Sequence, residues 1–261
     1  MDVGIQREQH FLVDKEVVKE LVKALDINQN DIILEIGAGE GFITKELVKK
    51  KGKVIAVEID EMFEGILQKI KGDKEMVIGD VKQVLEMRSD FNKITGNIPF
   101  QISEPLLRYL CLSRKIERAV LIVPAHFVAR MSNHPIFSAF LEFEVIQELE
   151  KEAFEPMPKV KTVIVKIVKS KKENKEVFIK RKLYWQRDKK LKNGLRDLLI
   201  DIYRNESGKE LTKKKARGII EKWDMEEDIL ERLISVMPLE YYEKIVKLIE
   251  KVDGKNIVAQ V

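Results

Sequence analysis

The feature that most constrains this 261-residue chain is a glycine-rich turn directly after a short apolar segment. Residues 32–36 are mostly apolar, which is typical of a buried parallel strand, and residues 42–50 are predicted to form a helix. Between them, Gly37, Gly39 and Gly41 lack a Cβ, so the backbone can turn tightly and approach a ligand closely. The sequence therefore predicts a strand–turn–helix unit that holds a nucleotide-like cofactor.

Acidic residues follow the next two predicted strands. Strand 54–57 leads to Glu58 and strand 76–78 leads to Asp80. An acid about 20 residues after such a glycine turn accepts hydrogen bonds from ribose hydroxyls in doubly wound nucleotide folds. With Glu35, these acids are expected to form an acidic rim, which suits the cationic S-adenosylmethionine better than NAD. The alternative is that Glu58 and Asp80 are solvated acids at strand ends.

The tetrapeptide Asn97-Ile98-Pro99-Phe100 follows a later apolar segment. The Asn97 amide oxygen and a backbone carbonyl beside Pro99 can both accept a hydrogen bond from an exocyclic amine. Pro99 has a fixed φ and restricts Ile98, so the direction of that carbonyl is preset. Two acceptors would aim the amine lone pair at a methyl sulfonium, and the Phe100 ring offers a surface for base stacking. The alternative is a loop with a structural Asn-Pro turn.

With these motifs, the chain resembles the KsgA-like ribosomal RNA adenine N6-dimethyltransferases. Matching stretches run in order along nearly the whole chain: residues 9–12, 35–41, 58–60, 79–80, 97–100, 154–160 and 187–195. The resemblance implies an α/β fold, with a Rossmann-like class I methyltransferase sheet over residues 1–170 and a small helical RNA-binding domain over residues 177–261. It also implies an enzyme that transfers methyl groups from S-adenosylmethionine to the N6 amine of adenine, most simply in small-subunit ribosomal RNA, during ribosome biogenesis.

The resemblance further implies roles for individual residues. His10 and Leu12 would close over the cofactor, and Phe154 would face Phe100 across a flipped adenine. The expected cofactor-binding residues are His10, Leu12, Glu35, Gly37, Gly39, Glu58, Ile59, Asp80, Val81 and Asn97. The expected catalytic residues are Asn97, Pro99 and Phe100, and the expected substrate-binding residues are Phe100, Phe154, Arg187, Lys189 and Lys190.

The chain departs from the family pattern on the side where substrate is expected. Phe100 replaces a more usual Tyr, and Pro124-Ala125-His126 stands where relatives carry polar residues. Residues 132–140 are shorter and more apolar than the basic loop of relatives. Two alternatives therefore stay open: a ribosome-assembly or RNA-binding factor that keeps the fold, and a methyltransferase with a different RNA target or a single methyl product.

Charge is spread unevenly, although the net charge is only +4. Residues 169–196 hold 12 Lys and Arg against 3 Asp and Glu, and the stretches on either side are slightly acidic. Basic residues interleaved with Tyr184 and Trp185 are typical of a nucleic-acid surface. We interpret residues 169–175 as a solvated linker and residues 187–196 as an RNA-binding helix.

The remaining composition narrows the class of protein. A single cysteine, Cys111, lies in residues 106–112, which have an apolar helical pattern that follows Pro105. One cysteine cannot form a disulfide within the chain, so we expect a reducing, cytoplasmic compartment. We also expect a monomer. The first residues do not resemble a signal peptide, and no apolar run approaches the roughly 20 residues of a membrane span. His10, His126 and His134 lack neighbouring metal ligands in the sequence, so we expect no metal site.

Secondary structure is predicted to alternate as far as residue 168 and to be helical afterwards. Residues 14–25 have the periodicity of an amphipathic helix, and residues 119–123 that of a buried strand. Residues 140–149 and 161–168 are expected to close the sheet as an antiparallel pair, by resemblance to methyltransferases. Apolar residues recur at helical spacing from Val177 onward.

Overall fold

The computed structural model describes residues 10–252, apart from the side chain of Phe100. These residues fall into two compact units, which we name the sheet unit and the helical unit. The sheet unit contains the chain as far as Asn133 together with Leu141–Ser170, and the helical unit contains His134–Phe140 and the chain from Lys171 onward. The polypeptide therefore passes between the two units three times.

The sheet unit is built on a seven-stranded sheet with the order β4-β3-β2-β5-β6-β9-β7. Strands β2 to β6 pair in parallel. Strand β9 is antiparallel to β7, as expected from the resemblance, and also to β6. The central strands are buried on both faces, which explains their continuous apolar runs. The strands are β2 (Ile32–Ile36), β3 (Lys53–Glu58), β4 (Lys74–Ile78), β5 (Lys93–Asn97), β6 (Arg118–Pro124), β7 (Leu141–Leu149) and β9 (Thr162–Lys169).

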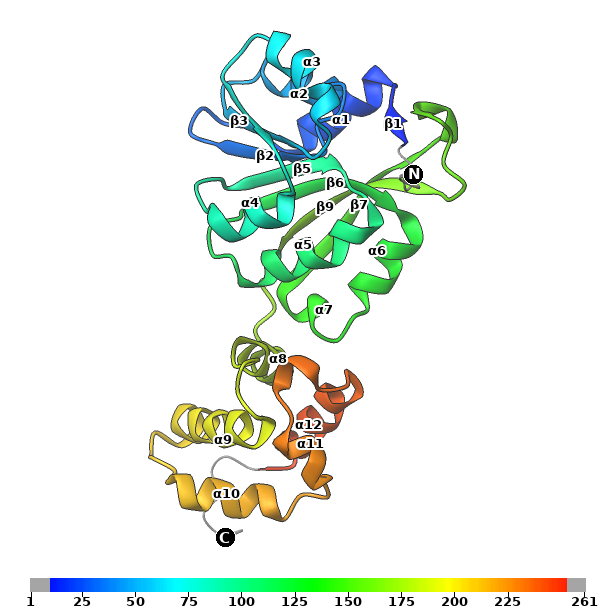
Figure 1. The fold of residues 1–261 in the computed structure, drawn as a ribbon. Helices are drawn as coiled ribbons and strands as arrows, with labels where there is room; N and C mark the ends of the chain where they lie inside the picture. The colour runs from blue at the N-terminus through cyan, green and yellow to red at the C-terminus, as the bar shows by residue number, and fades with distance from the viewer. Residues whose placement is uncertain (1–9, 253–261) are drawn as a thin grey trace, which may run out of the picture. The chain divides into compact units, whose positions relative to one another are not determined.

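Helices cover both faces of this sheet. Figure 1 shows α1 (Lys15–Ala24), α2 (Phe42–Leu47) and α3 (Glu64–Lys69) on one side, and α4 (Val81–Met87), α5 (Phe100–Leu112) and α6 (Ala125–Ser132) on the other. A separate two-stranded sheet pairs β1 (Phe11–Leu12) with β8 (Phe154–Glu155). Two short 3-10 helices, η1 (Glu61–Phe63) and η2 (Lys151–Ala153), complete this unit.

Local sequence signals set most of these boundaries, and α1 is the clearest case. The Asp14 side chain accepts hydrogen bonds from the first backbone amides of α1, as an N-cap does. Val17, Val18, Leu21 and Val22 are buried, as the periodicity predicts. The predicted helix over 14–25 is therefore confirmed, with Asp14 and Leu25 as its caps.

Two predicted helix boundaries were wrong. The helix predicted over residues 42–50 ends at Leu47, and α5 begins at Phe100, well before the apolar pattern that follows Pro105. A proline usually marks a helix boundary, but α5 continues through Pro105. The catalytic tetrapeptide expected from the sequence therefore leads directly into the first turn of α5.

The helical unit packs its helices around a core of aliphatic side chains that includes Leu195, Leu198 and Ile245. The helix α9 (Leu191–Ser207) is capped by Gly208, whose φ of 68° is the left-handed conformation that closes many helices. Its elements are α7 (Phe137–Phe140), α8 (Lys175–Trp185), α9 (Leu191–Ser207), α10 (Lys213–Glu221), α11 (Glu227–Glu231), η3 (Ile234–Val236) and α12 (Glu240–Glu250). Within residues 10–252, no helix is long and apolar enough to span a bilayer.

The apolar segment 134–140 packs within the helical unit. The Phe140 ring meets Tyr184 and Trp185 edge-on, with ring centroids 5.4 and 5.8 Å apart. Arg181 Nε donates to the carbonyl oxygen of Ala139 at 2.8 Å. Packing against α8 therefore gives a structural reason for the apolar character of this segment.

Candidate active site

The candidate site lies where the strand order of the sheet reverses. The chain proceeds from β2 to β3 on one side, and β5 pairs with the other side of β2. Ligands of open α/β sheets bind outside the carboxyl ends of the strands at such a switch point. At this edge, a Cβ on Gly37 would lie 3.9 Å from the Asn97 carbonyl oxygen, so the glycine turn and the tetrapeptide are adjacent.

Gly96 permits this close approach. Its φ is +151°, and a Cβ there would lie 2.3 Å from the Ile36 carbonyl oxygen. A side chain at position 96 would therefore push the end of β5 away from β2. Glycine at this position holds Asn97 beside the turn.

The glycine turn has left-handed backbone at Gly37, Gly39 and Gly41. Glu58 anchors it from below: one carboxylate oxygen accepts from the amide of Gly39 at 2.7 Å, and the other accepts from the amides of Ile59 and Asp60 at 2.9 and 3.0 Å. Glu58 is buried, so it is not a solvated acid. A carboxylate has about four acceptor positions, which leaves Glu58 capacity for one further donor.

Glu35 does not lie on an acidic rim, contrary to the sequence-based expectation. Its side chain is fully buried, and one oxygen accepts from Thr44 Oγ1 at 2.7 Å. The other oxygen, Oε1, has no hydrogen-bond partner among the described residues. Burial raises the pKa of Glu35 to about 8. The hydrogen bond from Thr44 lowers this pKa, and the negative charge of Glu58 raises it by a smaller amount. Glu35 is therefore a buried and largely protonated acid at pH 7, in the strand that precedes the glycine turn.

Asp80, Val81 and Ile59 lie at the ends of the neighbouring strands. Asp80 is half-buried and caps α4 by accepting from the amide of Lys82 at 2.8 Å, and Val81 is buried. Ile59 is 47 % exposed although it is apolar. An exposed aliphatic side chain beside Glu58 is suited to cover one face of a planar ring.

Asn97 connects this edge to the N-terminal segment. Its Nδ2 donates to the carbonyl oxygen of His10 at 2.7 Å, and no partner of its Oδ1 occurs among the described residues. His10 Nδ1 in turn lies 2.7 Å from the carbonyl oxygen of Pro156. Because Leu12 pairs with Phe154 in the small β1–β8 sheet, the structure brings His10, Leu12, Asn97 and Phe154 together.

The backbone around Pro99 offers one acceptor. The Pro99 carbonyl oxygen already accepts from the amide of Ile102 at 2.9 Å and from Ser103 Oγ at 3.3 Å. Among the described residues, no donor reaches the carbonyl oxygen of Ile98. The acceptor beside Pro99 is therefore the Ile98 carbonyl, which adjoins the Asn97 side chain in the chain.

The two aromatic residues expected at the base pocket differ in what the structure shows. Phe154 is 3 % exposed and belongs to the hydrophobic core together with Leu12 and Val17. It presents no open face for a base in this conformation. The side chain of Phe100 lies outside the described residues, so the stacking of a base between the two rings stays a prediction.

Phe11 is a site residue that the sequence reasoning missed. A Cβ on Gly39 would lie 3.4 Å from the Phe11 ring, which therefore sits over the glycine turn. The ring also meets Phe63 edge-on, with centroids 5.8 Å apart. The sequence could have indicated this role, because Phe11 lies between His10 and Leu12, which were both expected to contact the cofactor.

The basic residues expected to bind substrate are mostly engaged within the helical unit. Lys189 pairs with Asp197 at 2.8 Å, and Lys190 pairs with Glu231 at 2.9 Å. The guanidinium of Arg187 lies 5.9 Å from the centroid of the Tyr184 ring. Two of the three predicted cations are thus matched by acids of the same unit.

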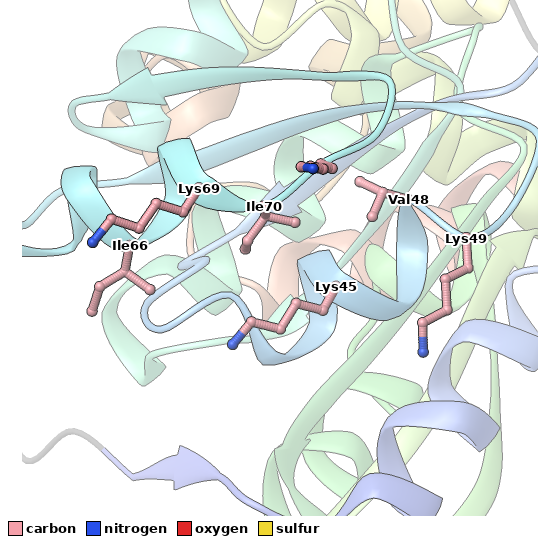
Figure 2. Close-up of a pocket in the computed structure, with 7 residues that line it drawn as sticks. Lys45, Val48, Lys49, Ile66, Lys69 and Ile70 are labelled. Atoms are coloured by element: carbon pink, nitrogen blue, oxygen red, sulfur yellow. The ribbon is translucent and has the colours of Figure 1, made fainter.

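A surface hollow of about 510 Å³ lies elsewhere on the sheet unit, beside α2 and α3 (Figure 2). Its lining contains none of the expected site residues; it consists of Lys45, Val48, Lys49, Ile66, Lys69, Ile70 and Lys71. The polar groups that can orient a substrate instead converge at the edge described above. In residues 10–252, no group of three or more His, Cys, Asp or Glu side chains could hold a metal ion.

Comparison with known proteins identifies the family. The model of the ribosomal RNA adenine dimethylase family matches residues 5–236. The chain belongs to this family. A probable ribosomal RNA small subunit methyltransferase A of Methanococcus maripaludis is 32 % identical over 249 residues, which cover 88 % of this chain and 90 % of the relative. The protein of the same name from Pyrococcus abyssi is 34 % identical over 203 residues, covering 72 % and 74 %.

Solved structures agree on the fold of the family. A dimethyladenosine transferase from Plasmodium falciparum superposes with a TM-score of 0.59 at 24 % identity, covering 95 % of this chain and 98 % of that chain. The 23S rRNA methyltransferase ErmE superposes with a TM-score of 0.58 at 16 % identity, covering 92 % and 99 %. The predicted Rossmann-like class I methyltransferase fold is therefore confirmed.

Proposed function

We propose that this protein transfers methyl groups from S-adenosylmethionine to the N6 amine of adenine in RNA, with small-subunit ribosomal RNA as the target. One observation carries the proposal. Asn97 Oδ1 and the Ile98 carbonyl are two acceptors without donors among the described residues, at the carboxyl end of β5 beside Gly37. Family membership and the names of the relatives support the same reaction.

The residues at this edge fit S-adenosylmethionine. Glu58 keeps one acceptor position for a ribose hydroxyl, Asp80 can accept from an adenine amine, and the exposed Ile59 can cover the adenine ring. Gly37 lets the backbone approach the methionine part, and His10 and Leu12 would close over it from the N-terminal segment. When bound, this cofactor supplies a methyl group on a cationic sulfur, which is a reactive electrophile.

The protein's own residues would orient the nucleophile. The two N6 hydrogens of a flipped adenine would donate to Asn97 Oδ1 and to the Ile98 carbonyl, which points the nitrogen lone pair in the remaining direction. This is an effect of proximity and orientation, so no strong general base is needed. Taking the base out of its stack costs a few kcal/mol, and we propose that stacking on Phe100 recovers part of that cost.

A ribosome-assembly factor without activity was the main alternative, suggested by the altered segment 124–140. Packing of residues 134–140 against α8 accounts for the apolar part of that change without any loss of catalysis. The donor and acceptor groups at Glu58 and Asn97 are also intact. A different RNA target or a single methyl product is a separate alternative, which the experiment below distinguishes.

The test combines cofactor binding with product analysis. Calorimetric titration with S-adenosylmethionine should show micromolar binding by the wild-type protein and by Asn97→Ala. Incubation of wild-type protein with small-subunit ribosomal RNA should yield N6-methylated adenosine by nucleoside mass spectrometry, and the spectrum distinguishes one methyl from two. Asn97→Ala should lower that yield by more than about 100-fold, since the amine loses an orienting acceptor.

The matched control is Asn30→Ala, which removes an exposed asparagine just before β2, at the opposite end of that strand from the candidate site. It should leave both measurements unchanged. Equal loss of cofactor binding and methylation in Asn97→Ala would contradict the role assigned to the side chain. Methylation of another RNA in preference to small-subunit RNA would contradict the proposed target.

A further inference from the structure

The helical unit carries a second basic surface, formed by the first two turns of α10. It comprises Lys213, Lys214, Lys215, Arg217 and Gly218, and we name it the α10 surface. Lys213, Lys214 and Arg217 are exposed, while Ala216, Ile219 and Ile220 face the core. Among the described residues, none of these four cations forms an ion pair. The α10 surface is therefore a cluster of positive charge without local compensation.

The contrast with residues 187–196 is direct. There, Lys189 and Lys190 are matched by acids of the same unit at 2.8 and 2.9 Å. Both stretches are rich in lysine, but the lysines Lys189 and Lys190 are paired with acids, whereas the four cations of the α10 surface stay available for an outside anion. Glu221, the one acid within α10, makes no ion pair with Arg217 one turn earlier.

Helix stability does not explain this arrangement. The amino-terminal end of a helix carries partial positive charge, so acids stabilise the first turn and lysines destabilise it. The first turn of α10 has no acid and three lysines. Lys213 and Arg217 are also one turn apart on the same face, where like charges repel. The basic residues of the α10 surface therefore destabilise the helix that carries them.

Gly218 is a further residue of the α10 surface that helix stability does not explain. A Cβ at this position would meet no atom within 4 Å, and its φ is not in the left-handed range. Neither packing nor backbone conformation requires glycine, which weakens a helix interior relative to alanine. Its effect is to leave bare backbone one turn after Lys214, where a ligand chain can approach closely.

We propose that the α10 surface binds the phosphate backbone of the RNA substrate, away from the methylated base. This inference rests on the proposed function and adds a second contact region to it. A phosphodiester backbone supplies repeated anions for the four cations. The amides of Lys213 and Lys214, which have no acceptor among the described residues, can donate to phosphate oxygens at the end of a nine-residue helix.

The main test is the triple variant Lys213→Gln/Lys214→Gln/Lys215→Gln in the full chain. Binding is measured by fluorescence anisotropy with naked small-subunit ribosomal RNA from Methanococcus maripaludis, the organism of a relative, over a series of salt concentrations. Affinity at about 0.15 M salt should fall at least about tenfold, and the slope of log affinity against log salt should fall by about two to three. Binding of S-adenosylmethionine should stay as in the wild type.

A second variant tests close approach without removing charge. Gly218→Gln places a long neutral side chain into open space and uses a better helix former. It should weaken RNA binding several-fold while raising the thermal midpoint. The triple glutamine variant should also raise the midpoint, because it removes repulsion and an unfavourable dipole interaction. A purely structural role for these residues would lower both midpoints.

The control also removes three lysines, but from α12 and the residue that follows it. In Lys244→Gln/Lys247→Gln/Lys251→Gln, Lys244 is mid-helix and lies 3.8 Å from Glu226, whereas Lys247 and Lys251 are at the C-terminal end, where cations stabilise the helix. This variant should lower the midpoint slightly and leave RNA affinity within about twofold.

Three results would overturn the proposal. One is unchanged RNA affinity and salt slope in the α10 triple variant while the wild type methylates RNA. Another is an equal affinity loss in the α12 control. The third is loss of binding to intact small subunits with unchanged binding to naked RNA, which would indicate an acidic protein partner. A wild type that binds no S-adenosylmethionine would instead refute the proposed function, so the two failures are distinguishable.

Discussion

The candidate active site and the helical unit satisfy their charged and polar side chains in different ways. At the active site, Glu58, Asp80 and Asn97 each bond to backbone amides or carbonyls. In the helical unit, Lys189 and Lys190 pair with carboxylates of α9 and α11. Backbone partners hold a group in a fixed position, whereas exposed ion pairs contribute little and exchange readily. A run of basic residues in this sequence is therefore weaker evidence for a binding site than a motif whose side chains are held by hydrogen bonds to the backbone.

The largest effect is expected at Gly96, which holds Asn97 beside the glycine turn of the candidate active site. Gly96→Ala places a Cβ 2.3 Å from the Ile36 carbonyl oxygen at a φ of +151°, so β5 must shift. The free energy of unfolding should fall by about 3 kcal/mol or more, and cofactor affinity should fall with it. Urea-induced unfolding measures the first and calorimetry the second. Gly65→Ala, where a Cβ meets nothing within 4 Å, should leave both intact.

The next effect concerns the anchor of the glycine turn. Glu58→Gln keeps the shape but turns an amide NH2 toward backbone amides that now donate to carboxylate oxygens. A buried donor left without an acceptor costs about 1–3 kcal/mol, so we expect a loss of that size in unfolding free energy. Affinity for S-adenosylmethionine should fall by more than tenfold. The exposed Glu64→Gln is the control, and equal behaviour of the two variants would contradict the anchoring role.

A third prediction uses the titration of Glu35. Its pKa is raised to about 8, so the folded state holds this proton more tightly than the unfolded state. The stability that this group contributes is complete below its ordinary pKa and is lost as pH rises toward 8. Glu35→Gln, which cannot ionise, should therefore gain thermal midpoint relative to the wild type between pH 5 and pH 8.5. Parallel curves for the two proteins would show that Glu35 is not buried as a neutral acid.

The smallest effect on stability is expected for Glu231, whose ion pairs lie in the helical unit. Glu231 holds both Lys190 and Lys192, in contacts where all three side chains are between 40 and 52 % exposed. Glu231→Gln should leave the free energy of unfolding nearly unchanged, because exposed ion pairs contribute little to stability. If Lys190 binds RNA as predicted, releasing it should raise RNA affinity a few-fold in low salt. Unchanged affinity would remove residues 190–192 from the RNA surface.

The sequence predicted the fold well where its signals are local. The amphipathic helix over residues 14–25, the apolar strand before Gly37 and the alternation to residue 168 each depend on neighbours within a few residues, and the structure confirms them. It also predicted that the glycine turn and Asn97 belong to one site, because the ends of parallel strands share one edge of a sheet.

What could not be predicted depends on distant parts of the chain. The pairing of Lys190 with a carboxylate 41 residues away, and the Phe11 ring over Gly39, exist only after folding. The burial of Glu35 was missed because an acid within a strand gives no sign of whether its side chain faces the edge or the interior. The start of α5 was missed because Pro105 suggested a boundary that tertiary packing overrides.

The interrupted course of the polypeptide has a practical consequence for anyone dissecting this protein. Residues 134–140 belong to the helical unit but are encoded in the middle of the sheet unit. A C-terminal fragment cut after Ser170 would lack Phe140 and leave the aromatic faces of Tyr184 and Trp185 uncovered. Transplanting the helical unit onto another enzyme therefore requires grafting two separate stretches of chain, because neither stretch alone carries its complete core.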